Sequence, residues 1–134
     1  MTAFDPRNET GVAFDYAQEG IRSLGTNALP ALLALVHQQD TNVPLAGGMA
    51  VVGFTVLEAT AAPTVGALVE CLDDSRLEVR ASAAESLGKI GPSAASALPR
   101  LITAVGDSDP WVRIWAVQDL VWIPGNPERG MALT

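Results

Sequence analysis

The sequence predicts an all-α protein, built as a right-handed superhelical solenoid of about seven helices. The first observation is an internal repeat, in which Val79-Arg80 returns as Val112-Arg113 and Leu87 returns as Leu120. Each pair is separated by 33 residues, so the repeat is a true period. A period of this length that contains two helical segments is typical of stacked helical repeats.

Composition is the second observation. Of the 134 residues, 49% are hydrophobic but 5% are aromatic, so small aliphatic side chains fill the expected helix interfaces. A chain of this length suits one domain with a core. We therefore expect a single domain over residues 1–134, divided into a half-repeat at 11–25, repeats at about 28–58, 62–91 and 93–123, and an irregular tail at 124–134.

Glycine and proline residues mark the ends of the predicted helices. The first helix, at about 11–24, ends at Gly25, because glycine is a common helix C-cap residue. The second begins near Ala28, with Pro30 in its first turn, where a proline costs no hydrogen bond. Helices at about 44–58 and 62–72 complete this part of the chain.

The two later repeats carry clearer boundaries. Helices are expected at about 77–90 and 93–105, separated by Gly91-Pro92-Ser93, in which Ser93 can cap the second of them. The last helix begins at Asp109-Pro110, with the aspartate as N-cap and the proline in the first turn. It ends at Ile123-Pro124-Gly125, because the following residues cannot be helical.

The repeat register also predicts the core. Apolar residues that recur at helical spacing in the two best repeats are expected to be buried. They are Leu68, Leu72, Val79, Ala83, Leu87, Ile90, Leu101, Val105, Val112, Ala116 and Leu120.

Two segments of the chain resemble the HEAT family of α-solenoid repeats. Leu98-Pro99-Arg100-Leu101-Ile102, followed by the turn 107–113, matches the family pattern of a proline-bearing first helix, an Asp-rich turn and a Val-Arg pair. The segment 78–92 is similar to it as well. The resemblance covers residues 29–123 and is weaker before them. It departs at Ala46-Gly47, where Val-Arg is expected. The resemblance implies a solenoid fold and a scaffold role.

Charge argues against several classes of partner. The net charge is −7 and the chain contains a single lysine, Lys89. Nucleic acids and anionic membrane surfaces are bound through Lys and Arg, so we expect neither as a partner. Residues 43–57 carry no charge, but Pro44, Gly47-Gly48 and Pro63 divide this apolar region into two helices rather than one membrane span. Residues 1–6 lack the features of a signal peptide, which favours the cytoplasm.

Few residues suggest catalysis or metal binding. Cys71 is the single cysteine and lies on an apolar helix face, where we expect it to be buried and inert. His37 is the single histidine, in a turn 34 residues before Cys71, and we expect it to be solvated. We therefore expect no catalytic residues, no metal site and no cofactor.

Acidic turns with arginines recur at the repeat period. They contain Asp73, Asp74, Asp107 and Asp109, together with Arg80 and Arg113. Catalytic groups have no reason to repeat, whereas carboxylates favour helix N-termini and an arginine can bridge neighbouring turns. We therefore expect a structural ladder, in which Arg113 bonds an acidic or carbonyl group of the turn at Asp74.

Three tryptophans form the most distinctive feature. Trp111, Trp115 and Trp122 fall at i, i+4 and i+11, which is one helical stripe. One period earlier these positions hold polar residues, which indicates a solvent-facing stripe. Second helices line the concave face in HEAT-like stacks, and exposed aromatic and methionine side chains commonly anchor binding surfaces. A row across that face reads Tyr16, Met49, Ser82 and Trp115.

The last helix has a second apolar side, at Ile114, Val117 and Val121. A solenoid end normally shows a polar outer face. The tail 124–134 or a second copy of the protein, in a homodimer through the C-terminal repeat, is therefore expected to cover it. Such covering can also involve the tryptophan stripe, so a ligand groove and a covered surface both remain open.

These observations predict a cytoplasmic, non-enzymatic scaffold that binds a protein or peptide. Its concave face would hold a peptide or helix through Trp111, Trp115, Trp122, Tyr16 and Met49. Glu78 and Glu85 favour a basic partner. The alternative is an accessory enzyme similar to the HEAT-like phycobilin lyases, which bind a tetrapyrrole, although no cysteine and histidine set supports it.

Overall fold

The computed structural model describes residues 18–38 and 46–124, and no side chain is described at 46 and 47. The part of the chain so described is helical apart from short turns, and it contains no strand. The protein is therefore all-α, as predicted. Tyr16, most of the predicted half-repeat, residues 39–45 and residues 125–134 lie outside the described residues.

The helices follow the predicted repeat closely. Helical residues 18–24 lead through the 3₁₀ helix η1 into α2, and Pro30 lies in the first turn of α2 as expected. Asp109 caps α7, accepting a hydrogen bond from the backbone N–H of Val112 at 3.1 Å. The elements are η1 (Gly25–Ala28), α2 (Leu29–His37), α3 (Ala46–Leu57), η2 (Glu58–Thr64), α4 (Val65–Cys71), α5 (Leu77–Ile90), η3 (Gly91–Ala97), α6 (Leu98–Ala104) and α7 (Pro110–Trp122).

The prediction of about seven separate helices is wrong for the described residues. Helical structure there runs in four unbroken stretches, at 18–37, 46–71, 77–104 and 110–122. The reason is that 3₁₀ helices, rather than loops, carry the chain from one α-helix into the next. Ser93 accordingly lies inside η3 and does not cap the following helix.

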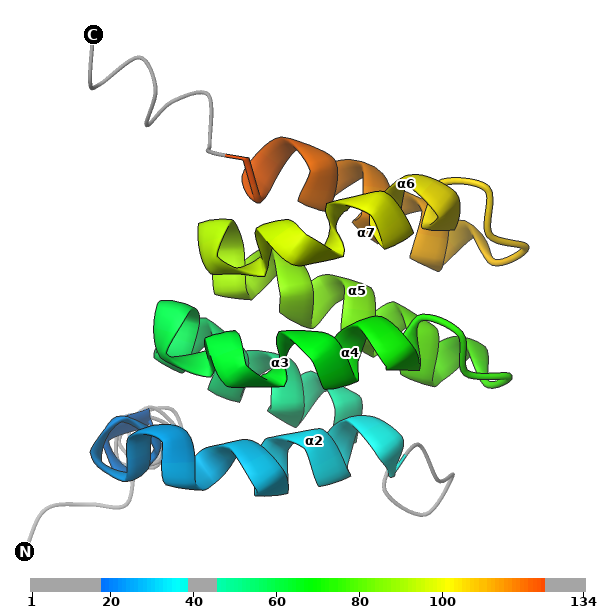
Figure 1. Ribbon diagram of the computed structural model, residues 1–134. Coiled ribbons are helices and arrows are strands. Elements are labelled where there is room, and N and C mark those ends of the chain that lie inside the picture. Colours follow the sequence, from blue (N-terminus) through cyan, green and yellow to red (C-terminus); the bar gives the residue numbers. More distant parts are fainter. Residues whose placement is uncertain (1–17, 39–45, 125–134) are drawn as a thin grey trace, which may run out of the picture.

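The α-helices form two layers (Figure 1). Helices α2, α4 and α6 lie in order along one side of the molecule. Helices α3, α5 and α7 lie behind them, with α5 packed against both α3 and α7. Each front helix also contacts the back helix that follows it in the chain, as α4 contacts α5 and α6 contacts α7. The last repeat, formed by α6 and α7, therefore lies at one end of the stack.

The period is visible in the backbone as well. Three residues with positive φ are spaced 33 apart: Gly25 (φ 54°), Glu58 (φ 47°) and Gly91 (φ 80°). Each directly follows an α-helical segment, where a left-handed residue ends the helix. Glutamate has a steric cost in this conformation that glycine avoids. Glu58 is thus a strained exception within a regular pattern.

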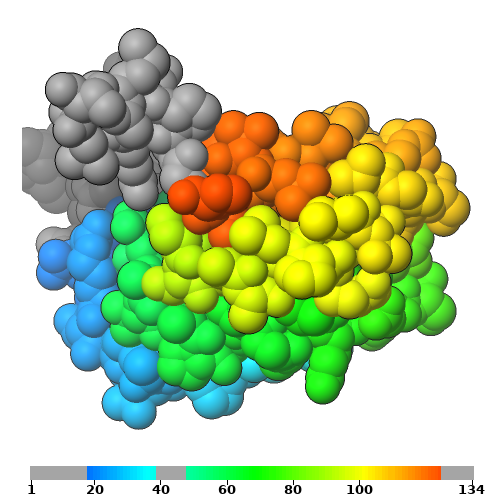
Figure 2. All heavy atoms as spheres, turned by 45° about the horizontal axis from the view of Figure 1, so that its top comes forward, coloured from blue at the N-terminus to red at the C-terminus, as the bar shows by residue number. Residues whose placement is uncertain are grey.

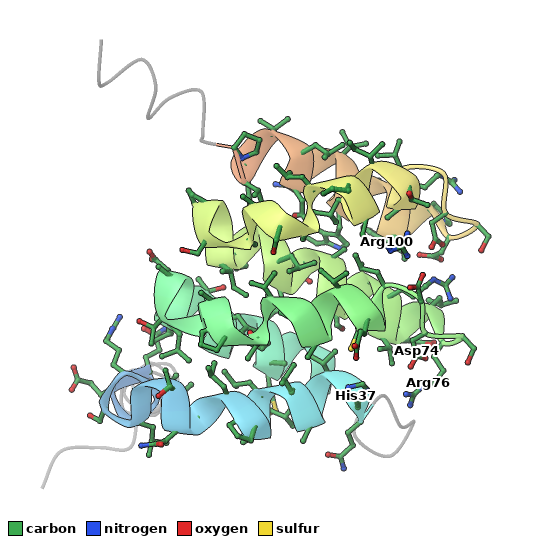
Figure 3. The ribbon with its side chains drawn as sticks, in the orientation of Figure 1. His37, Asp74, Arg76 and Arg100 are labelled. Carbon is green, nitrogen blue, oxygen red and sulfur yellow. The ribbon has the colours of Figure 1, made fainter. Side chains whose placement is uncertain are left out.

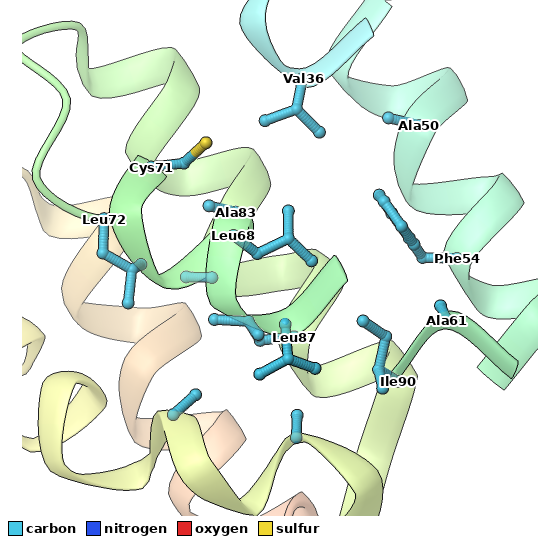
Figure 4. Packing of buried hydrophobic residues seen from close by; sticks show 14 of the residues in the cluster. Val36, Ala50, Phe54, Ala61, Leu68, Cys71, Leu72, Ala83, Leu87 and Ile90 are labelled. Carbon is cyan, nitrogen blue, oxygen red and sulfur yellow. The ribbon is translucent and has the colours of Figure 1, made fainter. Parts of the chain in front are cut away.

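One cluster of buried hydrophobic residues runs through the described helices, and Figure 4 shows part of it. Leu68, Leu87 and Val112 are fully buried, as predicted from the repeat register. Leu120 is partly buried against the core. The prediction for Val105 is wrong, because this residue is 37% exposed. Its counterpart one period earlier, Leu72, is 4% exposed, and Val105 differs because it lies at the end of the stack.

One stretch, Gly48–Cys71, is long and apolar enough to cross a membrane by length and composition. Core helices of soluble proteins pass the same test. In the structure, 44% of its most apolar window is buried, and α3 packs against α5. Glu58 and Pro63 interrupt it in η2, so the stretch is weak evidence for a membrane span.

Candidate functional site

The outward face of α3, α5 and α7 is the candidate binding surface. Helical spacing places three rows on it: Met49, Val52 and Val56 of α3, Glu78, Ser82, Glu85 and Lys89 of α5, and Trp111, Trp115, Gln118 and Trp122 of α7. We call these residues the outward face. None of the three rows contains a fully buried side chain.

Exposure differs among the predicted anchors. Met49 is 57% exposed and Trp111 is 62% exposed, although both are large apolar side chains. Trp115 is partly buried and packs against the core, so part of its ring already has a structural role. Glu78 is exposed and Glu85 is half-buried. The structure thus brings the predicted residues of α3, α5 and α7 onto one layer, while Tyr16 lies outside the described residues.

Trp122 is not bare. The ammonium nitrogen of Lys89 lies over its ring, 4.8 Å from the centroid. Lys89 and Trp122 are one period apart, so α5 and α7 bring corresponding positions together. A cation at this distance is attracted by the electron-rich face of the ring. The partial burial of Trp122 therefore includes a contact with a residue that the sequence analysis had placed in solvent.

A buried carboxyl group lies one turn before Trp122. Asp119 is 1% exposed, and its Oδ2 has no hydrogen-bond partner among the described residues. Burial, together with the nearby Glu85, raises the pKa of Asp119 to about 8, whereas Lys89 opposes the shift. Burial also raises the pKa of Glu85. Asp119 is consequently protonated at neutral pH.

Gly88 makes room for this carboxyl group. A Cβ atom built on Gly88 would lie 2.1 Å from Oδ1 of Asp119, which is closer than atoms approach without moving. Asp119 was not among the residues predicted from the sequence. Its position could have indicated burial, because helical spacing places Asp119 on the same side of α7 as the apolar residues Val112 and Ala116. The residue one period earlier, Ser86, is buried as well.

The Asp-rich turns have matching hydrogen bonds in successive repeats. Asp74 accepts the backbone N–H of Arg76 at 2.9 Å, and Asp107 accepts that of Asp109 at 2.8 Å. Arg80 donates to the backbone carbonyls of Asp74 and Ser75, at 3.0 and 3.1 Å. These bonds support the prediction of a structural role for the turns.

The predicted partner of Arg113 is wrong. This side chain donates to the carbonyls of its own turn, Asp107 and Ser108, at 2.8 and 3.2 Å, and not to the turn at Asp74. The bridge between the two turns is made by Arg80 instead, which binds both carboxylate oxygens of Asp107 in the following repeat, at 3.0 and 3.1 Å. Burial raises the pKa of Asp107, but the bonds from Asp109 and Arg80 outweigh it, and the pKa is lowered.

Two further arginines connect the turn at residues 73–76 to α2 and α6 (Figure 3). Arg76 donates to the carbonyl of His37 at 2.8 Å and pairs with Asp74 at 3.1 Å. The hydrogen bonds from Arg76 lower the pKa of Asp74. Arg100 pairs with Asp73. The turns are therefore held together along one edge of the stack.

His37 and Cys71 meet, although 34 residues separate them. The distance from Sγ of Cys71 to Nε2 of His37 is 3.5 Å. Cys71 is buried and His37 is exposed, as expected, and the two side chains meet because α2 and α4, which end at these residues, are in contact. Burial raises the pKa of the Cys71 thiol, and Asp74 adds to the effect. A buried, protonated thiol is a poor nucleophile.

The end of the stack is apolar. Ile114, Val117 and Val121 of α7 are exposed, as predicted from the sequence. Figure 2 shows this end of the molecule, with α6 in yellow beside α7 in orange. A shallow hollow of about 380 Å³ lies at Pro110, Arg113, Ile114 and Val117. A second hollow, of about 390 Å³, lies at the other end of the stack, where Gln18 and Arg22 face Val52, Thr55, Val56 and Glu58.

No group of three or more His, Cys, Asp or Glu side chains in the described ranges is arranged to hold a metal ion.

The fold and the outward face define a helical-repeat protein with an exposed surface of mixed apolar and acidic character. The family model for HEAT repeats matches residues 64–134, which is more than half of the chain. The chain belongs to the HEAT repeat family. Repeats of this family generally mediate protein–protein interactions. No curated protein and no solved structure gave a match.

Proposed function

We propose that this protein is a cytoplasmic, non-enzymatic scaffold, built as a right-handed HEAT solenoid whose concave surface is the outward face. It binds a peptide or helix of a partner protein there. The observation that carries this proposal is the exposure of Met49 and Trp111, at 57% and 62%, on one layer. Exposed methionine and tryptophan side chains are frequent anchors of binding surfaces.

Charge favours a basic partner. The chain carries a net charge of −7, and Glu78 and Glu85 lie between the apolar rows of α3 and α7. A partner helix with alternating apolar and basic side chains would match this surface. Complementary charges raise the association rate and select partners more than they raise affinity. Binding should therefore weaken as the salt concentration increases.

Binding of a synthetic amphipathic peptide of leucine and lysine tests this function. We expect tryptophan fluorescence to report saturable binding that Trp111→Ala and Met49→Asp each weaken by roughly thirtyfold, the size of an interface hot spot. Val121→Asp, at the end of the stack, is the control and should bind normally. Equal affinity for the wild type and both outward-face variants would contradict the proposal, as would equal binding of a leucine and glutamate peptide.

The tetrapyrrole-binding alternative remains open to a direct test. The buried, protonated thiol of Cys71 gives no support for a covalent link to a bilin. Incubation with a bilin, followed by gel filtration and absorbance measurement, distinguishes the two functions. A bilin absorbance band that elutes with the protein would favour the alternative.

The apolar end supports a second interaction, in which two copies associate through their last repeats. Ala84 and Gly88, one period before Val117 and Val121, are buried. The packing of α7 against α5 covers this side of α5, and a second copy would cover the same side of α7. A two-fold pairing lets one apolar patch cover itself.

Sedimentation analysis tests the homodimer. We expect a concentration-dependent dimer for the wild type and a monomer for Val121→Asp. Met49→Asp, on the outward face, should remain dimeric. A wild type that is monomeric at high concentration would exclude this pairing.

A further inference from the structure

Lys89 and Trp122 form an aromatic site that the chain itself fills. The ammonium nitrogen lies 4.8 Å from the ring centroid, and Lys89 is the single lysine of the sequence. Lys89 belongs to the last turn of α5, and Trp122 ends α7. Both side chains are half-buried and belong to the outward face. The contact is therefore within reach of a molecule bound on that face.

The surroundings of this contact favour a cation. Glu85, a partly buried acidic residue, lies one turn before Lys89 on α5. Two helices also end here, and helix C-termini stabilise positive charge. The remaining charged side chains of α5 and α7 are Glu78, Arg80 and Arg113, which lie near the opposite ends of the two helices. Lys89 is thus the cation that these two helices supply at this end.

Lys89 has a second position available to it. Glu85 precedes it by four residues, and a glutamate four residues before a lysine forms a favourable pair on a helix surface. No ion pair joins the two in the described part of the chain, because the ammonium lies over the ring instead. Moving the ammonium from Trp122 to Glu85 exchanges one weak interaction for another. The face of Trp122 can therefore be exposed at little cost.

An arginine side chain fits the exposed ring better than Lys89 does. A guanidinium group is planar, more weakly hydrated than an ammonium and stacks on aromatic faces. We propose that the face of Trp122 binds an arginine side chain of the partner protein, and that Lys89 occupies this site until the arginine displaces it towards Glu85. This inference rests on the proposed function of the outward face.

A small cationic probe tests the site without the partner. The indole N–H signals of the full chain are followed by NMR during titration with N-acetyl-arginine amide, and Trp122→Phe identifies the signal of Trp122. N-acetyl-norleucine amide, which lacks the charge, is the control ligand. Lys89→Ala and Lys89→Gln remove the internal cation in two ways, and either one suffices if the other folds poorly. Arg113→Ala removes a cation from the opposite end of α7.

We expect the arginine probe to shift the Trp122 signal saturably. Its affinity should be about threefold to tenfold higher in the Lys89 variants than in the wild type, as expected when a competing cation–π contact is removed. Arg113→Ala should behave as the wild type, and the neutral probe should have no effect. An absent shift in the Lys89 variants, or an affinity equal to that of the wild type, would overturn the inference.

The same variants separate this inference from the proposed function. If the leucine and lysine peptide binds the outward face but neither Lys89→Ala nor Trp122→Phe alters its affinity or that of the arginine probe, the site at Trp122 is refuted and the binding face stands. If the probe binds at Trp122 but no peptide binds, the proposed function is refuted and the cation site stands.

Discussion

Replacing Asp119 by asparagine should remove a pH dependence from the stability of this protein. The folded-state pKa of Asp119 is about 8, against an ordinary value of 3.8. A raised pKa means that the folded state holds its proton while the unfolded chain ionises. The contribution of Asp119 to stability is therefore greatest below pH 3.8, falls as the pH rises, and stops falling above about pH 8. An asparagine side chain at this position would have no proton to lose.

The size of the effect follows from the same values. Between pH 5 and pH 7 the unfolded chain is ionised at this site and the folded protein is protonated. Each pH unit in this range then costs about 1.4 kcal/mol, so the wild type should lose about 2–3 kcal/mol between pH 5 and pH 7. Water entry at the site would reduce this value. Gly88 limits relaxation, because Oδ1 of Asp119 fills the space beside it.

Urea unfolding of the wild type and Asp119→Asn at several pH values measures this difference. The variant can differ in absolute stability, because an amide replaces a carboxyl group. The comparison therefore concerns the slope of the free energy of unfolding against pH. Glu85→Gln is a companion variant: the pKa of Glu85 is also raised by burial, and because Glu85 raises the pKa of Asp119, its removal should reduce the slope without abolishing it. Asp74 and Asp107 have lowered pKa values and add stability that is constant above about pH 5. Parallel slopes for the wild type and Asp119→Asn would refute the burial argument.

Two further predictions concern stability, and thermal or urea unfolding measures both. Glu58→Gly should stabilise the protein by about 1 kcal/mol, because φ is 47° at this residue and glycine adopts positive φ without steric cost; a clear loss of stability would show that the glutamate side chain makes a compensating contact. Leu87→Ala should destabilise the protein by about 2–5 kcal/mol, because Leu87 is fully buried between the two layers; a nearly neutral change would show that the core is not packed as described.

The repeat period was sufficient to predict much of the fold. The predicted limits of the helix at 77–90 agree with α5, and Asp109 and Pro110 begin α7 as the capping pattern indicated. Local rules decide these features, because a helix boundary depends on residues that are neighbours in the chain. The exposure of Val117 and Val121 was also predictable, since the period shows which side of α7 corresponds to the buried side of α5.

The tertiary structure decided which side chains meet across the repeats. Periodicity places residues on a face, but the offset between stacked helices determines which neighbour a side chain reaches. The forward bridge from Arg80 to Asp107 depends on that offset, as do the contact of His37 with Cys71 and the position of Lys89 over Trp122.

Asp119 shows most clearly that periodicity alone does not predict the contacts of a polar side chain. Its charge predicts an exposed residue, whereas its place in the period predicts a buried one. The outcome depended on the space beside Gly88, which exists because α5 and α7 pack together. The sequence by itself determined the repeat, the helix limits and the apolar faces, because these depend on local spacing. The polar contacts were decided by tertiary packing, because each requires two distant segments to be placed within a few ångströms of one another.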